Sequence, residues 1–250
     1  MSTYKLTIAY DGTDLVGWQR QADGTSVQGL LEAALSELDG RQVVVIGAGR
    51  TDAGVHALGQ VAGFSIDRVI DAASITRALN AKLPPAVRVI DATETRADFH
   101  ARFDARAKTY RYRIWNDEVL SPFERAYAWH VPAPRLDVEA MAAAAALFEG
   151  RHDFAAFQAS GAATRTTERT VFSCRVRAEP PAIIACEVSG DGFLRHMVRN
   201  MIGTLVEVGR GRRPVDWVGR VLTSRDRAQA GPTAPADGLF LMSVSYGVVQ

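Results

Sequence analysis

The chain has 250 residues, which is long enough to bury a hydrophobic core in one large domain or in two small ones. Its 29 basic and 28 acidic residues give a formal net charge of +1, which excludes a global attraction to nucleic acid, so an anionic partner requires a local basic patch. Two cysteines are too few for a disulfide scaffold or a zinc cage. We find no signal-peptide pattern and no apolar run of membrane-spanning length, and therefore expect a soluble, cytoplasmic protein without a membrane partner.

The basic residues are nearly all arginines. Only three of the 29 are lysines, which leaves 26 arginines (29 − 3). Arginine suits bidentate phosphate contacts and stacking on bases. Biased codon usage explains the same excess equally well, and the many alanines fit it too.

The first half of the sequence predicts elements in the order β-α-β-β-α-β. Its first helix is bounded by an N-cap at Thr25 or Ser26 and by a stop at Gly40, with apolar residues at helical spacing between them. A proline pair, Pro84-Pro85, stops the second helix. The strands and the second helix are expected, in chain order, at Lys5–Tyr10, Gln42–Ile46, Gly59–Ile66, Asp71–Lys82 and Val87–Thr93.

The second half repeats this order. Its segments are the strand "AKTYRYRIW", the helix "DVEAMAAAAALFEG", the strands "RTVFSCRVRAE" and "AIIACEVSG", a long helix at Phe193–Val208, a shorter helix near Asp216–Thr223 and the strand "GLFLMSVSY". Each half matches the split βαβ arrangement. The sequence therefore predicts an α+β fold of two ferredoxin-like halves, residues 1–103 and 104–250, with antiparallel or mixed sheets flanking a central active-site cleft.

The stretch "VVVIGAGRTDAGVHALGQVAGFSID" resembles a dinucleotide-binding fingerprint at first sight. An apolar run leads into Gly47 and Gly49, and Asp67 follows about 20 residues later, as in that motif. The third glycine position, however, is held by Asp52, whose carboxylate would repel a pyrophosphate. The segment that would have to form the crossover helix is interrupted by Gly54. The pattern therefore argues against a nucleotide site.

What remains is a glycine-rich loop that carries Arg50, Asp52 and His56 between two expected strands. The glycines permit unusual φ values and let a substrate approach the backbone closely. Two ligands without a cluster argue against a metal site at Asp52 and His56. Asp52 can cap a turn, which is the usual role of Asp beside Gly, or it can be a catalytic carboxylate. The local pattern does not decide between these two roles.

Longer motifs, which include this loop, resemble one known protein family over nearly the whole chain. The segment "GAGRTDAGVHALGQV" resembles the catalytic motif of the tRNA pseudouridine synthase A family. Further blocks similar to that family follow its order: "YDGTDLVGWQRQ", "SVQGLLEAAL", "DFHARFDARAKTYRYRI", "GFLRHMVRNMIGTLVEVGRG" and "GPTAPADGLFLMSVSY". Two departures are small: Gly63 stands where an aromatic residue or His is commoner, and the segment Asp237–Phe240 varies a His/Glu-Gly-Leu-Tyr pattern.

The resemblance implies an isomerase without cofactor or metal. Such an enzyme converts uridine to pseudouridine at positions 38, 39 and 40 in the anticodon stem and loop of tRNA. The target base must leave its stack before its glycosidic carbon can be reached. The family forms a homodimer whose RNA groove takes residues from both subunits, so the resemblance also implies a homodimer here.

The same resemblance assigns roles to individual residues. It makes Asp52 the essential carboxylate, Tyr110 the ring that stacks on the uracil, and Arg199 the ion-pair partner of Asp52 in a cleft between the lobes. Leu239 becomes an apolar wall for the base. Arg50 is expected to fill the vacated space and contact phosphate, although it can also be a charge partner of Asp52.

His56, Lys108 and Arg195 complete the expected substrate-binding set. Strand alternation places Lys108 on the same face as Tyr110, and a helical spacing of four places Arg195 on the same face as Arg199. Basic residues interleaved with aromatics are expected to form a phosphate-tracking groove, with some of them on plain solvated faces. These clusters are His100, Arg102, Arg106, Lys108, Arg111 and Arg113 with Phe99, Phe103, Tyr110 and Tyr112; Arg210, Arg212 and Arg213; and Arg165 with Arg169.

Two other classes of protein compete with this interpretation. Split βαβ units also build RNA-recognition modules without enzymatic activity, but the chain has no RNP1-like Lys/Arg-Gly-Phe-Gly-Phe pattern. The nucleotide-binding enzyme is already disfavoured by Asp52. The sequence therefore predicts an RNA-modifying enzyme.

Overall fold

The computed structural model describes residues 1–159, 161 and 164–247, and the chain divides into two compact units. The first unit comprises residues 1–106 together with the segment from Phe240 onward, and the second comprises residues 107–239. Relative to the expected ranges 1–103 and 104–250, the segment from Phe240 onward groups with the first unit. Helices and strands occur in both units, which confirms the α+β class.

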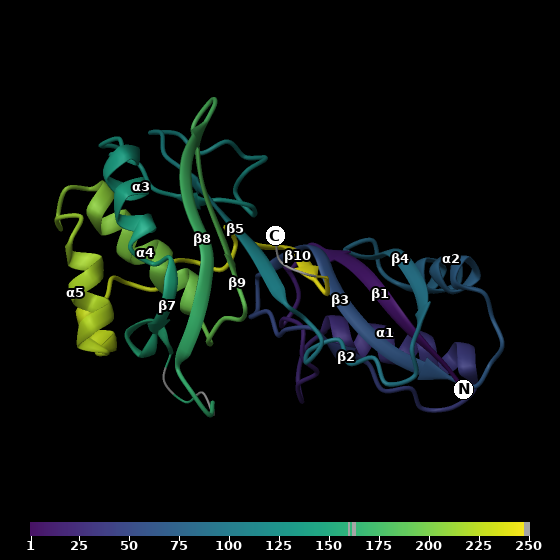
Figure 1. The fold of residues 1–250 in the computed structure, drawn as a ribbon. Coiled ribbons are helices and arrows are strands. Elements are labelled where there is room, and N and C mark those ends of the chain that lie inside the picture. The colour runs from purple at the N-terminus through teal and green to yellow at the C-terminus, as the bar shows by residue number, and fades with distance from the viewer. Residues whose placement is uncertain (160, 162–163, 248–250) are drawn as a thin grey trace. The chain divides into compact units, whose positions relative to one another are not determined.

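The first unit is a split βαβ fold. Its sheet has the antiparallel order β4-β1-β3, and two further strands pair with β3: β2 antiparallel at Gly63, and β10 parallel at His56. Helix α2 packs on β4, and α1 packs beside α2 (Figure 1). The elements are β1 (Ser2–Tyr10), α1 (Val27–Asp39), β2 (Ile46–Gly47), β3 (His56–Ile66), α2 (Ala72–Lys82), β4 (Val87–Thr95) and β10 (Leu239–Ser245). The expected β-α-β-β-α-β order is confirmed.

The ends of α1 follow the sequence signals. Ser26 is the N-cap, and its hydroxyl accepts a hydrogen bond from the backbone N–H of Gly29 at 3.2 Å. Gly40 ends the helix in the left-handed conformation, with φ of 76°, which a residue without Cβ adopts without strain. Both helix limits are therefore confirmed.

The expected strand at Gln42–Ile46 is wrong, because β2 is only two residues long and begins at Ile46. Side chains of α1 take the backbone N–H groups that a strand would need for its ladder. The N–H of Val43 donates to the Ser36 hydroxyl at 2.9 Å, and the N–H of Val45 donates to the Glu32 carboxylate at 3.2 Å. The segment packs against the helix instead of extending the sheet.

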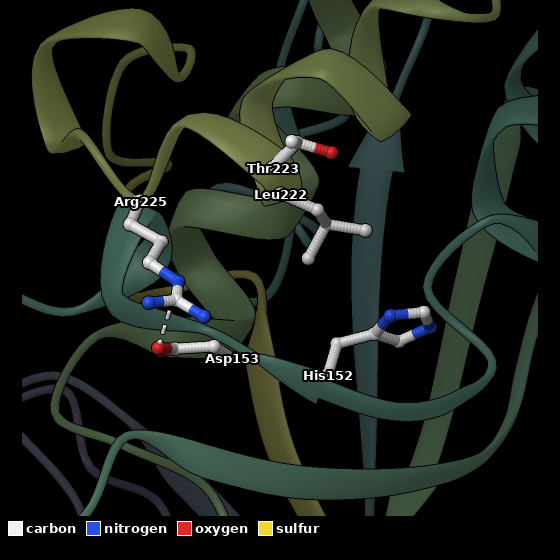
Figure 2. A pocket seen from close by; sticks show the side chains of 5 residues that line it. All are labelled: His152, Asp153, Leu222, Thr223 and Arg225. Atoms are coloured by element: carbon white, nitrogen blue, oxygen red, sulfur yellow. Dashed lines mark ion pairs between the residues drawn. The ribbon is translucent and has the colours of Figure 1, made fainter.

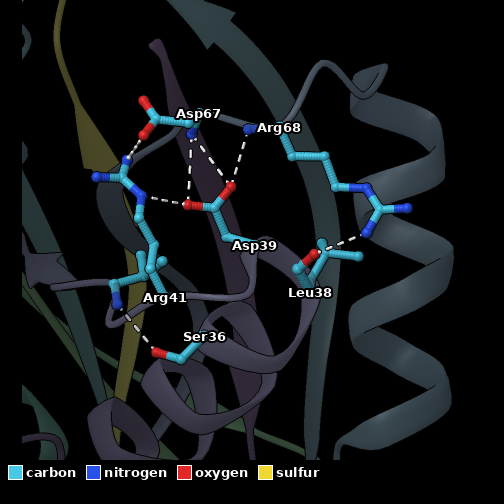
Figure 3. A network of polar contacts seen from close by, with 7 residues as sticks. Ser36, Leu38, Asp39, Arg41, Asp67 and Arg68 are labelled. Atoms are coloured by element: carbon cyan, nitrogen blue, oxygen red, sulfur yellow. Dashed lines mark hydrogen bonds and ion pairs between the residues drawn. The ribbon is translucent and has the colours of Figure 1, made fainter.

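A carboxylate joins the end of α1 to the end of β3 (Figure 3). Asp39 accepts hydrogen bonds from the backbone N–H groups of Asp67 and Arg68, the shortest at 2.8 Å, and pairs with the Arg41 guanidinium at 2.7 Å. The Arg68 N–H is the largest cause that lowers the pKa of Asp39, and the Arg41 side chain adds to it. This network fixes the C-terminal end of α1 against the segment that follows β3.

The second unit has the antiparallel sheet order β5-β9-β8-β7, with the short β6 parallel to β5. Helix α3 packs on β8 and α4, and three fully buried rings, Phe148, Phe154 and Phe157, fill the core beside them. The elements are β5 (Ala107–Trp115), β6 (Trp129–His130), α3 (Val138–Ala146), β7 (Gly150–Asp153), η1 (Ala155–Phe157), β8 (Glu168–Glu179), β9 (Ile183–Gly190), α4 (Met197–Gly209), α5 (Trp217–Ser224) and η2 (Arg227–Gln229).

The expected helix at Phe193–Val208 starts too early, because α4 begins at Met197. His196 precedes it in the left-handed conformation, with φ of 60°, which no α-helix continues through. Arg195 therefore lies outside the helix, and the expectation that it shares a helical face with Arg199 is wrong. Nearly all of α4 is buried, so it is a core helix of this unit.

No helix in the described part of the chain has the length and apolar character needed to cross a membrane.

Candidate active site

The loop that carries Asp52 lies in the first unit between β2 and β3. The N–H of Ala48 donates to the Val61 carbonyl at 2.7 Å where the loop begins. A tight turn follows, in which the N–H of Val55 donates to the Asp52 carbonyl at 3.2 Å and Gly54 has a φ of 79°. Asp52 is half-buried and Arg50 is exposed. The loop thus presents a carboxylate and a guanidinium at the edge of the unit.

A buried polar chain holds this loop from beneath. The Tyr10 and Thr51 hydroxyls share a hydrogen bond of 2.8 Å. The Gln60 amide donates to the Gly49 carbonyl at 3.0 Å and to the Tyr10 hydroxyl at 3.4 Å. Burial raises the pKa of Tyr10 to about 12, so its hydroxyl keeps its proton at physiological pH. The residues on both sides of Arg50 are therefore anchored, Gly49 through its carbonyl to Gln60 of β3 and Thr51 through its hydroxyl to Tyr10 of β1.

A second segment, residues 12–18, packs directly on the loop. The N–H of Trp18 donates to the Thr51 carbonyl at 3.1 Å. Gly17 has a φ of 101°, and a Cβ at this position would lie 2.5 Å from the Thr51 carbonyl oxygen and 2.9 Å from the Asp52 carbonyl carbon. A Cβ at Gly47 would lie 2.3 Å from the Trp18 indole. Gly47 thus leaves space for the Trp18 ring. This contact accounts for the first glycine of the apparent dinucleotide motif, so no bound phosphate is needed to explain it.

His56 is the first residue of β3 and is only 1% exposed. Its Nδ1 accepts the Gly12 N–H at 3.0 Å and lies 3.2 Å from an Asp11 carboxylate oxygen. Its ring stacks on Phe240, with the ring centroids 4.6 Å apart. The sequence suggests a substrate-binding group at His56. The imidazole is instead enclosed by protein, and its contacts hold Asp11 and Gly12 at the start of β3.

In the second unit, β5 shows the alternation that the sequence predicts. Tyr110 is 7% exposed and packs edge-on against Phe193, with the ring centroids 5.2 Å apart. Tyr112 is fully buried and donates to the Pro235 carbonyl at 2.9 Å, and burial raises the pKa of its hydroxyl. Lys108, at the start of this strand, is half-buried. The face bearing these tyrosines is thus the buried face of β5.

Carboxylates partner several arginines of the expected phosphate groove. Arg111 pairs with Glu179, and Arg113 pairs with Glu124 at 2.8 Å. Arg210 and Arg212 both pair with Glu207, at 3.1 Å and 3.2 Å. The protein itself supplies a negative charge for each of these arginines, from Glu124, Glu179 and Glu207, which the basic clusters did not include. Each of these four arginines thus has a carboxylate partner within the protein, and their contact with phosphate stays a prediction.

Arg199 projects from α4 and is oriented by the segment before β10. Its Nε donates to the Ala234 carbonyl at 2.7 Å, and the Ala234 N–H donates back to the Arg199 carbonyl at 3.1 Å. The next residue, Asn200, is fully buried, and its side-chain oxygen accepts from the Thr233 hydroxyl at 2.6 Å and from Arg227 at 3.0 Å. We name this segment, residues 231–235 with Arg227, the α4 clamp.

The α4 clamp lies on the helix backbone itself. A Cβ at Gly203 would lie 1.7 Å from the Pro232 carbonyl oxygen, and a Cβ at Gly231 would lie 2.7 Å from the Thr204 backbone. Leu239 follows the clamp at the start of β10, is 6% exposed, and donates its N–H to the Ala236 carbonyl at 2.9 Å. Arg195, by contrast, is exposed ahead of the helix.

A pocket of about 310 Å³ in the second unit holds none of the expected site residues (Figure 2). An ion pair of 3.1 Å between Asp153 and Arg225 forms one side of it. Its lining residues are His152, Asp153, Leu222, Thr223 and Arg225. Among the described residues, no group of three or more His, Cys, Asp or Glu side chains is arranged to hold a metal ion.

Sequence reasoning missed the residues that support the site. Tyr10, Gly17 and Gln60 hold the Asp52 loop, and Asn200 and Thr233 hold Arg199. Most of them lie inside the longer blocks quoted above, such as "YDGTDLVGWQRQ" and "GPTAPADG". The glycines of these blocks were the available signal, because glycine marks a close backbone approach, but a single sequence does not name the approaching segment.

Comparison with known proteins decides the family. The family model described as "tRNA pseudouridine synthase" matches residues 6–104 and 144–247. The chain belongs to the tRNA pseudouridine synthase family. Relatives named "tRNA pseudouridine synthase A" are 50% identical in Myxococcus xanthus and 50% identical in Syntrophotalea carbinolica, each over 246 residues. The match covers 98% of this chain, and 92% and 97% of those relatives. A relative of the same name from Solibacter usitatus is 48% identical, over 98% of this chain and 100% of its own length.

Proposed function

We propose that this protein isomerises uridine to pseudouridine at positions 38, 39 and 40 in the anticodon stem and loop of tRNA. The single observation that carries the proposal is the family membership of a chain that keeps an Asp in the "GRTDAG" loop. The anchored backbone around Asp52 supports it, because a carboxylate that acts on one carbon atom must be held in place.

The proposed reaction rearranges one base without any change in composition. The bond between uracil N1 and ribose C1′ breaks, the base turns, and a bond forms between C5 and C1′. A proton leaves C5 and N1 gains one, so atoms and electrons balance without a co-reactant. In this proposal Asp52 either attacks C1′ or removes a ribose proton to give a glycal.

The other site residues have proposed roles around this carboxylate. Arg199 pairs with Asp52 and keeps it ionised, Tyr110 stacks on the uracil, and Leu239 limits the base from the apolar side. Arg50 takes the space of the extruded nucleotide and contacts phosphate. The α4 clamp supports the role of Arg199, because the hydrogen bond from Nε to the Ala234 carbonyl restricts the orientation of the guanidinium.

We further propose that the protein acts as a homodimer that binds tRNA. The family resemblance supports the dimer, and the net charge of +1 supports a local groove rather than a uniformly basic surface. Lys108 and Arg195 remain proposed contacts to the tRNA, and the buried His56 is proposed to act by holding the loop.

Incubation with an unmodified tRNA transcript tests the function. Pseudouridine is then mapped by carbodiimide labelling and primer extension. We expect conversion at positions 38 to 40 and at no other uridine. Tight binding without conversion would favour an RNA-binding module. The absence of both binding and conversion would refute tRNA as the substrate.

A further inference from the structure

An exposed aromatic ring in the first unit has an imidazole and a guanidinium as neighbours. Phe103, in the segment between β4 and β5, is 74% exposed. The His100 ring stacks on it, with the ring centroids 4.2 Å apart and an angle of 28° between the planes. The Arg102 guanidinium lies 5.8 Å from the Phe103 centroid. We name these three side chains the Phe103 platform.

Backbone hydrogen bonds hold the platform in shape. Nδ1 of His100 accepts the N–H groups of Arg102 and Phe103, both at 3.2 Å. The Asp104 carboxylate accepts the N–H of His100 at 2.9 Å and pairs with Arg96. Because these hydrogen bonds fix the backbone of the turn, ordering the backbone costs little further conformational entropy on binding.

The base of the segment is packed on the sheet. The Phe99 ring lies against Gly63 of β3, where an added Cβ would be 3.3 Å from the ring. Tyr246 packs on Phe99, with the centroids 5.2 Å apart, and donates to the carbonyl of the fully buried Ala101 at 2.6 Å. The glycine at position 63, a departure from the family pattern, therefore makes room for Phe99. Phe99 is packed inward while Phe103 is presented to solvent.

The chemistry of the platform fits an unpaired nucleotide. An exposed ring offers a face to any base, and a neighbouring guanidinium contacts the phosphate or extends the stack. In the described part of the chain no carboxylate pairs with Arg102, in contrast to Arg111 and Arg113. A purely apolar contact with a protein partner would not need a guanidinium beside the ring. The presence of Arg102 therefore favours a nucleotide, which carries a phosphate.

We propose that the Phe103 platform binds an unpaired nucleotide of the substrate tRNA, with its base on the ring and its phosphate at Arg102. The proposal rests on the proposed function and adds a second contact on the same RNA. Gly63, beneath the platform, is seven residues along β3 from His56, or roughly 23 Å at about 3.3 Å per residue. The nucleotide bound here is therefore distinct from the uridine at Asp52.

Equilibrium binding of unmodified tRNA to the full chain tests the platform. Stacking of one base is worth about 1–3 kcal/mol, so Phe103→Ala should raise the Kd by roughly 5- to 150-fold. Phe103→Tyr keeps a ring and should restore binding. Phe123→Ala is the matched control, because Phe123 is 85% exposed in the second unit and should leave the Kd unchanged. Arg102→Gln should reduce the salt dependence of binding by about one phosphate contact.

Two results would overturn the proposal. A Kd for Phe103→Ala equal to that of the wild type would exclude stacking at this ring. A shift of Phe103→Ala to a smaller species in sedimentation, with tRNA affinity per subunit kept, would assign the ring to a protein contact. If the wild type converts uridine and the variants bind tRNA with the wild-type Kd, only the proposal for the Phe103 platform is refuted. If the wild type neither binds nor converts tRNA, the proposed function itself is refuted.

Discussion

Gly17→Ala should disable the Asp52 loop while leaving every proposed catalytic side chain in the protein. A Cβ at this position would lie 2.5 Å from the Thr51 carbonyl oxygen, whereas real Cβ atoms come no closer than 3.0 Å. The loop or residues 12–18 must therefore move by at least 0.5 Å (3.0 − 2.5). Because a misplacement of about 1 Å at a reacting centre can cost about 100-fold in rate, we expect kcat to fall by roughly tenfold or more.

The matched control is Gly40→Ala at the end of α1. Gly40 also has a positive φ, 76° against 101° for Gly17, but an added Cβ meets nothing within 4 Å. Backbone strain costs each variant about 1–3 kcal/mol of stability, whereas only Gly17→Ala creates a steric clash with the loop.

The assay is single-turnover pseudouridine formation at saturating tRNA, together with urea unfolding of both variants. We expect both to lose stability and only Gly17→Ala to lose rate. Wild-type kcat in a folded Gly17→Ala protein, or an equal loss of rate in Gly40→Ala, would refute the argument that residues 12–18 set the position of the loop.

Two further predictions concern the supports of the fold and of Arg199. Thr233→Val removes the hydroxyl that hydrogen-bonds to both Arg227 and Asn200 in the α4 clamp, and it should lower kcat about tenfold with little change in KM. Thr233→Ser keeps a hydroxyl and should keep the wild-type kcat. Equal values of kcat for the two variants would contradict a positioning role. The pKa of Asp39 is lowered by folding, so its contribution to stability is present above the unfolded pKa of about 3.9 and is lost as pH falls through the folded value. Urea unfolding should therefore show Asp39→Asn to be less stable than the wild type at pH 7, with a difference that shrinks as pH falls below about 3.9, and a pH-independent difference would argue against this linkage.

The local features of the fold were predictable from the sequence. The Ser26 cap and the Gly40 stop depend on side chains and φ preferences of the residues themselves, and both appear where the pattern indicates. The alternation of β5, with Tyr110 and Tyr112 inward, follows from the strand repeat of two. Such signals need no knowledge of what packs against the element.

The features that failed depend on contacts or conformations that a local pattern does not contain. The strand at Gln42–Ile46 is replaced by irregular chain because Ser36 and Glu32 take its N–H groups. The start of α4 is set by the left-handed His196, which no helical periodicity reveals. The carboxylate partners of Arg111 and Arg113 could likewise not be identified from the sequence, and the contact of these arginines with phosphate stays a prediction. The strand error thus arises from contacts with another element, and the helix error arises from a local backbone conformation that hydrophobic periodicity does not encode.

The candidate site shows the same division. Asp52 stands out in the sequence because a carboxylate replaces the glycine of a phosphate-binding motif. The loop's supports, Tyr10 and Gln60, come from two other strands and become visible only in the fold. The family motifs point to Asp52 as the proposed reactive group, and the structure shows the residues that hold its loop.

The most direct test compares wild type, Asp52→Asn and Asp52→Ala in pseudouridine formation and in tRNA binding. Asparagine keeps the shape of the side chain and removes its charge. The account predicts that neither variant forms detectable pseudouridine, while both bind tRNA with nearly the wild-type Kd, because phosphate contacts carry most of the affinity. Pseudouridine formation at the wild-type rate by folded Asp52→Asn would contradict the central claim that this carboxylate performs the reaction.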